Sequence, residues 1–514
     1  MAIPHPEWLN QALFYEIYPQ SFLDTNEDGI GDLPGIIKKL DYIKDLGFNA
    51  LWINPIFDSP FFDAGYDVRD FYAIAPRYGT MKDLTKLFKE AHKRGMHVLL
   101  DLVPGHTSTD CEWFKKSCQP EKNEYSDRYI WTDSVWKGEE DYPTLRGISA
   151  RNGSVLTNFF SIQPALNYGF YEVHHPEFEE EIRGEGPQKT IQAMVDVITF
   201  YLKKGCDGFR VDMAGWLVKR DPEGDGNVKL WKQIFSQFRE DYPEAAFISE
   251  WNNPLKSLKA GFDCDFLLQD LDSIQASLCR GEHPYFAFDD LDKNANEYFT
   301  RFDSLYEFAK KQKRFLSLIS GNHDTVRVGK SLNEEELKFY FTFMFTMPSV
   351  PFLYYGDEIG MKYLEGLTSV EGGYQRTGSR TPMQWDESEQ KGFSSYPNSS
   401  IQVNMDESVR PVSVQEKDEN SLLSFLKSLL AFKKDHAALD NDASYQRIET
   451  KNSSPIVYIR KKGNERLMIA LNPSKKIYSI SLGKFAGQVL FSYGQNKIKE
   501  DKFSLYPRSF IILK

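Results

Sequence analysis

Eight short apolar runs, separated by stretches with helical periodicity, constrain the fold of this chain more than any other feature. The runs lie between residue 12 and about residue 360 and are rich in β-branched or aromatic residues, as strands of a parallel sheet are when both faces are buried. They read ALFYEIYPQSF, ALWINPIF, HVLLDLV, CDGFRVDM, AAFISEW, CDFLLQ, FLSLIS and SVPFLYYG. Strands that alternate with helices form parallel sheets, so the pattern predicts an α/β fold.

The segments between the runs carry apolar residues on one helical face. Two of them show it clearly: one has Leu84, Leu87, Phe88 and Ala91, and the other has Ile191, Met194, Val195, Ile198 and Leu202. Eight strands with intervening helices favour a closed (β/α)₈ TIM barrel over an open doubly wound sheet. No GxGxxG turn follows the first run, which further disfavours an open dinucleotide-binding sheet.

Two parts of the sequence depart from the alternation. A long connection rich in Trp, Asp, Asn and Gly follows the third run, and we expect residues 107–172 to form an inserted B subdomain over the C-terminal face of the barrel. The barrel itself is then expected in two parts, residues 1–106 and 173–439. After a last helix near 422–438, strands such as SPIVYIRKK, RLMIALNP and SFIILK predict a C-terminal antiparallel β-sandwich over residues 440–514.

Charge and composition exclude several classes of protein. The formal net charge of −12 argues against nucleic acid or an anionic membrane as the main partner. The opening MAIPHPEWLN does not resemble a signal peptide, and no stretch approaches the roughly 20 apolar residues of a membrane span. Five cysteines without CxxC spacing favour free thiols over a Cys111–Cys118 disulfide. We therefore expect a cytoplasmic protein.

Ionisable residues cluster where the predicted strands end, which is where barrel enzymes carry their catalytic groups. Asp101 and His106 follow the third run, Arg210 and Asp212 the fourth, Glu250 the fifth, and His323 and Asp324 the seventh. A carboxylate behind an apolar strand is costly unless it is paired or functional. Each acid alone could belong to an ordinary salt bridge, but so many at one barrel mouth indicate a catalytic site.

This set matches the needs of retaining glycoside hydrolysis, which uses a carboxylate nucleophile and an acid/base about 5 Å apart. Arg210 precedes Asp212 by two residues and shares its strand face, so we expect it to lower the pKa of Asp212. Glu250 lies in an apolar run, which is expected to raise the pKa of an acid/base.

These residues lie in segments that resemble the α-amylase superfamily, glycoside hydrolase family 13. The matching segments are DLVPGHTS (101–108), QPALN (163–167), GFRVDMAGW (208–216), ISEW (248–251) and SGNHDT (320–325), in the order of that family. The resemblance implies that Asp212 is the nucleophile, Glu250 the general acid/base and Asp324 the stabiliser of the transition state. It also implies that the non-reducing sugar is held by Tyr66, Asp67, His106, Arg210 and His323.

Finer features resemble the branch that contains oligo-1,6-glucosidases, α-glucosidases and trehalose synthases. They are LFYEIYPQSF, DTNEDGIGDL, the Gln of QPALN and SRTPMQWD (379–386). In exo-acting members of this branch, an acid before GYD pairs with an arginine of the RTPMQWD segment and closes the pocket. Asp63 and Arg380 match those two positions. The alternative is that they form an ordinary ion pair at the surface. Gly105 and Ala165 replace the Asn and Asp of the family pattern, which argues against the interdomain calcium site of many amylases.

The loop from Asp24 to Asp32 suggests a metal site of a different kind. Oxygen-bearing side chains alternate there around a glycine, as in the first half of an EF-hand, but Gly35 occupies the twelfth position where an EF-hand has Glu. The resemblance implies a structural Ca²⁺ held by the side chains of Asp24, Asn26, Asp28 and Asp32 and the carbonyl of Ile30. A turn closed by Asx hydrogen bonds is the alternative.

The sequence thus predicts a retaining α-glycosidase of the α-glucosidase type that cleaves short α-glucosides and maltooligosaccharides from the non-reducing end. It needs no organic cofactor. A transglucosidase or trehalose-synthase-like isomerase on the same site and an α-amylase remain alternatives. Linkage preference (Met213 follows the nucleophile), chain-length preference and the choice between monomer and homodimer stay open.

Overall fold

The computed structural model describes residues 5–267, 273–289, 291–396 and 408–514 and contains a closed barrel of eight parallel strands. Each barrel strand lies in one of the eight apolar runs, so the predicted TIM barrel is confirmed. In barrel order the strands are β1 (Phe14–Ile17), β2 (Ala50–Ile53), β5 (His97–Leu102), β8 (Gly208–Val211), β9 (Ala246–Ser249), β10 (Cys264–Phe266), β11 (Phe315–Ile319) and β12 (Val350–Tyr354). The pairing of β1 with β12 closes the barrel.

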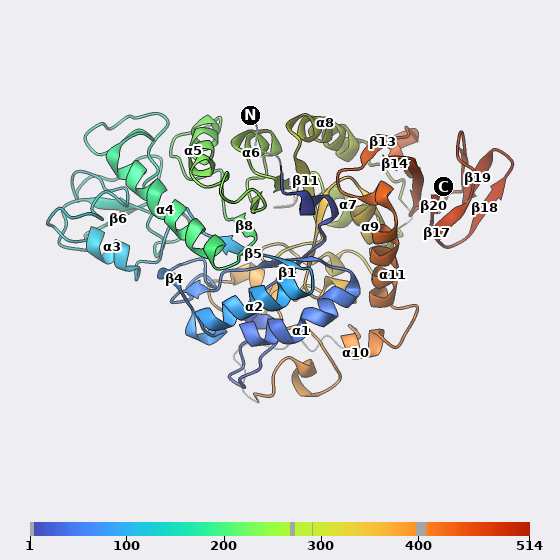
Figure 1. Ribbon diagram of the computed structural model, residues 1–514, viewed down its shortest axis with the longest axis horizontal. Helices are drawn as coiled ribbons and strands as arrows, with labels where there is room; N and C mark the ends of the chain where they lie inside the picture. Colours follow the sequence, from blue (N-terminus) through green and yellow to red (C-terminus); the bar gives the residue numbers. More distant parts are fainter. Residues whose placement is uncertain (1–4, 268–272, 290, 397–407) are drawn as a thin grey trace.

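Helices pack around the outside of this barrel (Figure 1). They include α1 (Leu33–Leu46), α2 (Met81–Lys93), α4 (Glu185–Lys203), α5 (Asp225–Ser236), α6 (Pro254–Ala260), α8 (Asn296–Gln312), α9 (Glu334–Thr346) and α11 (Leu422–Asp435). The apolar faces predicted for α2 and α4 are buried. The first turn of α2 is fixed by a capping box, in which Thr80 and Asp83 each bind the other's backbone N–H.

The long connection after β5 carries small elements of its own before α4 begins. They are α3 (Glu112–Ser117) and the antiparallel pair β6 (Thr144–Arg146) and β7 (Ser154–Leu156), which lie at one end of the molecule in Figure 1. Ile130, Leu156, Ala165 and Phe170 form a separate small core there. The connection also returns to the barrel, because a β-bridge joins His106 to Ala165. The exact limits, 107 and 172, stay a prediction.

The C-terminal strands form two antiparallel sheets at the opposite end of the molecule (Figure 1). One sheet has the order β13 (Ser444–Arg447), β14 (Ile456–Lys462), β15 (Glu465–Asn472), β20 (Ser509–Leu513), β17 (Val489–Tyr493), and the other the order β16 (Tyr478–Ser481), β19 (Lys502–Leu505), β18 (Asn496–Lys499). Side chains from both sheets share one core, including Val457, Ala470, Phe503 and Ile511. The predicted sandwich is therefore present.

Two further sequence expectations concern the chain as a whole. The five cysteines are free thiols, as expected. Within the described ranges, no helix combines the length and the apolar character that crossing a membrane requires.

Candidate active site

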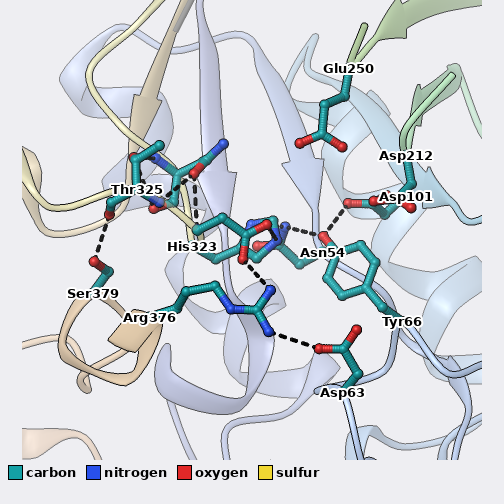
Figure 2. A network of polar contacts seen from close by, with 12 residues as sticks. Asn54, Asp63, Tyr66, Asp101, Asp212, Glu250, His323, Thr325, Arg376 and Ser379 are labelled. Atoms are coloured by element: carbon teal, nitrogen blue, oxygen red, sulfur yellow. Dashed lines mark hydrogen bonds and ion pairs between the residues drawn. The ribbon is translucent and has the colours of Figure 1, made fainter. Parts of the chain in front are cut away.

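The ends of neighbouring barrel strands bring three carboxylates onto one buried guanidinium. Arg210 in β8 lies beside Asp101 in β5, and its Nη1 is 2.8 Å from Asp101 Oδ1 and 3.1 Å from Asp212 Oδ1. Its Nη2 is 2.5 Å from Glu250 Oε2, which follows β9. Both predicted reacting groups thus share one cation, and Figure 2 shows them entering the site from adjacent strands. The predicted convergence at the barrel mouth is present.

The electrostatics of Asp212 differ from the sequence expectation. Burial raises the pKa of Asp212 well above its usual value, and the charges of Glu250, Asp101 and Asp324 add to this, while Arg210 lowers it. Arg210 does lower the pKa of Asp212, as expected, but the net shift is upward because Arg210 is shared among three carboxylates and does not offset the burial.

Two arginines and a histidine contact the Asp324 carboxylate. Its Oδ1 accepts hydrogen bonds from Arg376 Nη1 at 2.9 Å and from Arg380 Nη2 at 2.7 Å, and its Oδ2 is 3.1 Å from His323 Nε2. Burial alone would raise the pKa of Asp324, but His323 and the two arginines lower it well below its usual value. Asp324 is therefore a fixed anion at neutral pH.

His323 connects this anion to a second buried acid. Its Nδ1 lies 3.1 Å from Glu16 Oε1 and 3.0 Å from the Asn54 amide. Burial lowers the pKa of His323, but Asp324 and Glu16 outweigh it and raise the pKa to about 9. Burial raises the pKa of Glu16 to about 7. Sequence reasoning missed Glu16 and Asn54, although a glutamate inside the apolar run FYEI was a usable signal.

The hairpin of β3 (Phe57–Asp58) and β4 (Asp70–Ile74) places Tyr66 in the site. The Tyr66 ring stacks on the imidazole of His323 with centroids 5.1 Å apart, and its hydroxyl donates to Asp101 Oδ2 at 2.9 Å (Figure 2). Asp67 has a different environment: its carboxylate accepts hydrogen bonds from Ser59 Oγ and from the backbone N–H of Phe62, both at 2.9 Å. The Asp67 carboxylate therefore stabilises the loop to which it belongs. A contact between Asp67 and a sugar stays a prediction.

The ion pair expected between Asp63 and Arg380 involves a different arginine. Asp63 Oδ1 accepts from Arg376 Nη2 at 3.0 Å, while its Oδ2 accepts from Gln163 Nε2 at 2.8 Å. Arg376 therefore bridges Asp63 and Asp324, and Figure 2 shows its contact with Asp63. Arg380 instead donates from its Nε to the carbonyl of His323 at 2.9 Å and from its Nη2 to Asp324 Oδ1 at 2.7 Å. The pairing prediction was wrong, since chain spacing does not show which of two arginines one turn apart faces the acid.

His106 is buried beside this pocket in its neutral form. Its Nε2 lies 3.0 Å from the carbonyl of Tyr66, and Asn158 Nδ2 donates to its Nδ1 at 3.3 Å. An Nε2–H tautomer satisfies both contacts. Burial lowers the pKa of His106 to about 4, so it carries no charge near neutral pH.

The Asp24–Asp32 loop, which follows β1, is closed by Asx hydrogen bonds. Asp24 Oδ1 accepts from the backbone N–H of Asn26 at 3.1 Å, and Asp28 Oδ1 accepts from that of Ile30 at 2.8 Å. Asp32 caps α1 by accepting from Gly35 N at 2.7 Å. In the part of the chain that the structure describes, no Lys or Arg forms an ion pair with a carboxylate of this loop, and the loop carboxylates do not converge on one point.

Within the part of the chain that the structure describes, one other group of possible metal ligands comes from the inserted segment and the stretch that follows it. Glu139, His175 and Glu179 bring their ligand atoms within 4.8 Å of one another. Arg220 already pairs with both glutamates, and its Nη1 lies 2.7 Å from Glu179 Oε1. The guanidinium supplies the positive charge there, so the group is a salt-bridge cluster that joins the inserted segment to the loop after β8.

Comparisons with known proteins agree with this geometry. Residues 16–442 match the family model "Alpha amylase, catalytic domain". An α-glucosidase of Culex pipiens is 29% identical over 94% of this chain and 85% of its own length, and an oligo-1,6-glucosidase of Bacillus cereus is 29% identical over 91% of each. A solved isomaltulose synthase variant from Erwinia rhapontici NX5, in complex with sucrose, has a TM-score of 0.81 at 26% identity and 99% coverage of each chain. The chain belongs to the α-amylase family and is a glycoside hydrolase of the α-glucosidase type.

Proposed function

We propose that Asp212 and Glu250 carry out a double displacement on an α-glucoside, with Asp324 as the anion that stabilises the transition state. The observation that carries this proposal is the sharing of Arg210 by Asp212 and Glu250, at 3.1 and 2.5 Å. One guanidinium holds both carboxyl groups close together, and a retaining mechanism uses two carboxyl groups about 5 Å apart.

In the first step the Glu250 carboxyl protonates the glycosidic oxygen while Asp212 attacks the anomeric carbon. The bond to the leaving sugar breaks and a glucosyl ester on Asp212 forms. Asp324 and its cationic neighbours hold the sugar hydroxyls as positive charge develops on the ring. In the second step the Glu250 carboxylate takes a proton from water, and the water oxygen attacks the same carbon. The ester bond to Asp212 breaks, and glucose leaves with its α configuration retained.

We also propose that the pocket accepts one glucosyl unit from the non-reducing end. Arg376 connects Asp63 on the β3–β4 hairpin to Asp324 after β11, so this bridge crosses the site from one strand end to another. Gln163 of the inserted segment fixes the other oxygen of Asp63. A maltooligosaccharide cannot extend past this bridge, so only its terminal sugar fits into the pocket. This favours exo action over the internal cleavage of an α-amylase.

The test is a proton NMR time course with maltotriose that follows the anomeric signals from the first minutes. We expect α-glucose to appear first, beside maltose, and the Asp212→Asn variant to produce neither while keeping the wild-type melting temperature. Glucose that appears first as the β anomer would contradict the double displacement. Activity retained by Asp212→Asn would refute the nucleophile assignment.

Transfer of the glucosyl group to a sugar is the second candidate. The solved neighbour is named an isomaltulose synthase with sucrose as its natural substrate, and it shares the fold over nearly the whole chain. In the same NMR experiment, new glycosidic anomeric signals without matching free glucose would favour this candidate.

We further propose that the Asp24–Asp32 loop takes up a structural Ca²⁺ through the side chains of Asp24, Asn26, Asp28 and Asp32 and the carbonyl of Ile30. The donor set is all oxygen, as calcium prefers, and within the described ranges its three carboxylates form no ion pair with a Lys or Arg. The ion would stiffen the turn that leads into α1 and take no part in the chemistry.

We also propose a cytoplasmic location, because the five free thiols suit a reducing compartment.

A further inference from the structure

A glutamate that the catalytic steps above do not use lies in the interior of the barrel. Glu16 is a residue of β1 and is fully buried. Side chains alternate along a strand, so Glu16 shares a face of β1 with Phe14, whose ring stacks on Phe352 of β12 with centroids 4.1 Å apart. A carboxylate beside such an apolar layer is costly unless it is paired or functional.

Only one oxygen of this carboxylate is paired. Glu16 Oε1 lies 3.1 Å from His323 Nδ1, and within the described ranges Glu16 forms no other ion pair. Its Oε2 is buried without a hydrogen-bond partner among the described residues. A glutamine would fill the same volume, accept the same hydrogen bond from Nδ1 and cost less to bury, because an amide carries no charge. The burial of a carboxylate here therefore indicates a role for the charge itself.

Both ring nitrogens of His323 face acceptors. Nε2 lies 3.1 Å from Asp324 Oδ2, and Nδ1 faces Glu16 and the amide of Asn54, which Figure 2 shows beside the ring. With its oxygen turned toward Nδ1 at 3.0 Å, the Asn54 amide donates from its nitrogen to Glu16 Oε1 at 3.3 Å. A neutral imidazole has one N–H, so either neutral tautomer would turn a lone pair toward a carboxylate. Only the imidazolium donates to both acids.

The other groups around this pair do not stabilise an imidazolium by charge. Tyr66 and Tyr18 stack on the His323 ring at 5.1 and 6.1 Å, and Tyr354 lies on the strand next to β1. Burial raises the pKa of all three hydroxyls above the ordinary value, so all three are neutral below about pH 10. Arg380, which donates to the His323 carbonyl, is itself a cation. The two acids therefore hold the proton on His323.

The two acids differ in the number of cations that they contact. Asp324 accepts hydrogen bonds from Arg376 and Arg380 in addition to its contact with His323. Glu16 has His323 as its ion-pair partner, so its charge acts on the imidazole first. Arg210 is close enough to lower the pKa of Glu16, but three other carboxylates already share it.

We propose that Glu16 is a positioning residue that keeps His323 doubly protonated, so that its Nε2–H is available to Asp324 and to the sugar hydroxyls held there. This inference rests on the proposed function and adds a residue that acts through His323 without touching the substrate. Burial raises the pKa of Glu16 to about 7, and Asp324 and Glu16 raise that of His323 to about 9. The Glu16 charge therefore acts between about pH 7 and pH 9.

The direct test follows the His323 imidazole by ¹⁵N NMR in protein labelled at its nine histidines, with the His323 signals assigned by their loss in His323→Gln. In the wild type we expect both ring nitrogens to be protonated at about pH 7.5, with a titration midpoint near 9. Glu16→Gln keeps the shape but removes the charge, so the midpoint should fall by at least ~1 pH unit. A wild-type His323 that is neutral at about pH 7.5, or an unchanged midpoint in Glu16→Gln, would overturn the inference.

Glu358→Gln is the matched control. Glu358 is also fully buried and burial also raises its pKa to about 7, but its Oε1 accepts from the hydroxyls of Tyr15 and Tyr42, at 2.6 and 3.0 Å. We expect this variant to leave the His323 midpoint unchanged.

A rescue variant separates charge from packing. Adding Asn54→Asp to Glu16→Gln places a carboxylate beside Nδ1 again, from a different strand end, and should move the His323 midpoint back toward 9. A midpoint that stays low in the double variant would point to packing and count against the inference.

The catalytic consequence is measured with α-glucosyl fluoride, whose leaving group needs no proton from Glu250. The ratio of kcat/KM in Glu16→Gln to that in wild type should be about 3-fold lower at about pH 8.5 than at about pH 6, as a fall of the midpoint by ~1 unit implies. The ratio for Glu358→Gln should not change with pH, and a pH-independent ratio for Glu16→Gln would overturn the inference. If the wild type released no fluoride, the proposed function would fail, whereas the NMR titration would still decide whether Glu16 controls the charge of His323.

Discussion

Replacing Arg376 with methionine tests the bridge that closes the pocket. The change removes the guanidinium but keeps a long apolar side chain, so it abolishes the 3.0 Å hydrogen bond to Asp63 and the 2.9 Å hydrogen bond to Asp324. Asp324 keeps Arg380 and His323, and Asp63 keeps Gln163. The perturbation therefore removes one bridge without leaving either acid unpartnered.

The expected loss of kcat/KM depends on how exposed the Arg376 side chain is. Hydrogen bonds to charged groups contribute about 1.5–3 kcal/mol when buried and exposed ion pairs about 0.2–1 kcal/mol. The Arg376 side chain is 27% exposed, so about 1 kcal/mol for each of the two hydrogen bonds is a reasonable value. The sum of about 2 kcal/mol corresponds to a ~30-fold loss of kcat/KM on maltotriose.

The assay measures kcat/KM on maltotriose and the products formed from a longer maltooligosaccharide. Arg376→Met should lose ~30-fold on the short substrate and begin to release internal fragments, because the pocket is open beyond the first sugar. The control, Arg410→Met, removes an arginine paired with Glu334 and Asp418. In a cycle with Asp63→Asn, the double variant should lose less than the sum of the single losses. Wild-type kinetics and wild-type products in Arg376→Met would refute the reasoning.

Two further results are expected. The pKa of His323 is raised to about 9, above the ordinary histidine value of roughly 6.5, so its stabilising contribution is complete below about pH 6.5 and lost as pH rises to about 9. The melting-temperature difference between wild type and His323→Gln should therefore shrink over this range, and a constant difference would contradict it. For the calcium proposal, EDTA should lower the melting temperature and added Ca²⁺ should restore it, with Asp28→Ala insensitive to both; an unchanged melting temperature and no co-purified metal would reject the site.

Sequence alone determined the barrel and the position of its candidate catalytic groups. Apolar runs and helical periodicity are local properties of the chain, and parallel strands must bring their carboxyl ends to one face. Asp212, Glu250 and Asp324 could therefore be placed together from the order of residues. The C-terminal sandwich followed from the same kind of pattern.

Only the tertiary structure decided which partners these groups meet. Arg376 rather than Arg380 reaches Asp63, because the path of a loop fixes the direction of each guanidinium. The pKa of Asp212 is raised rather than lowered, because burial and three carboxylates around one arginine act together. The contact of Glu16 with His323 joins residues 307 positions apart. Electrostatics depends on distances in space and on the exclusion of water, and neither quantity is a property of the order of residues.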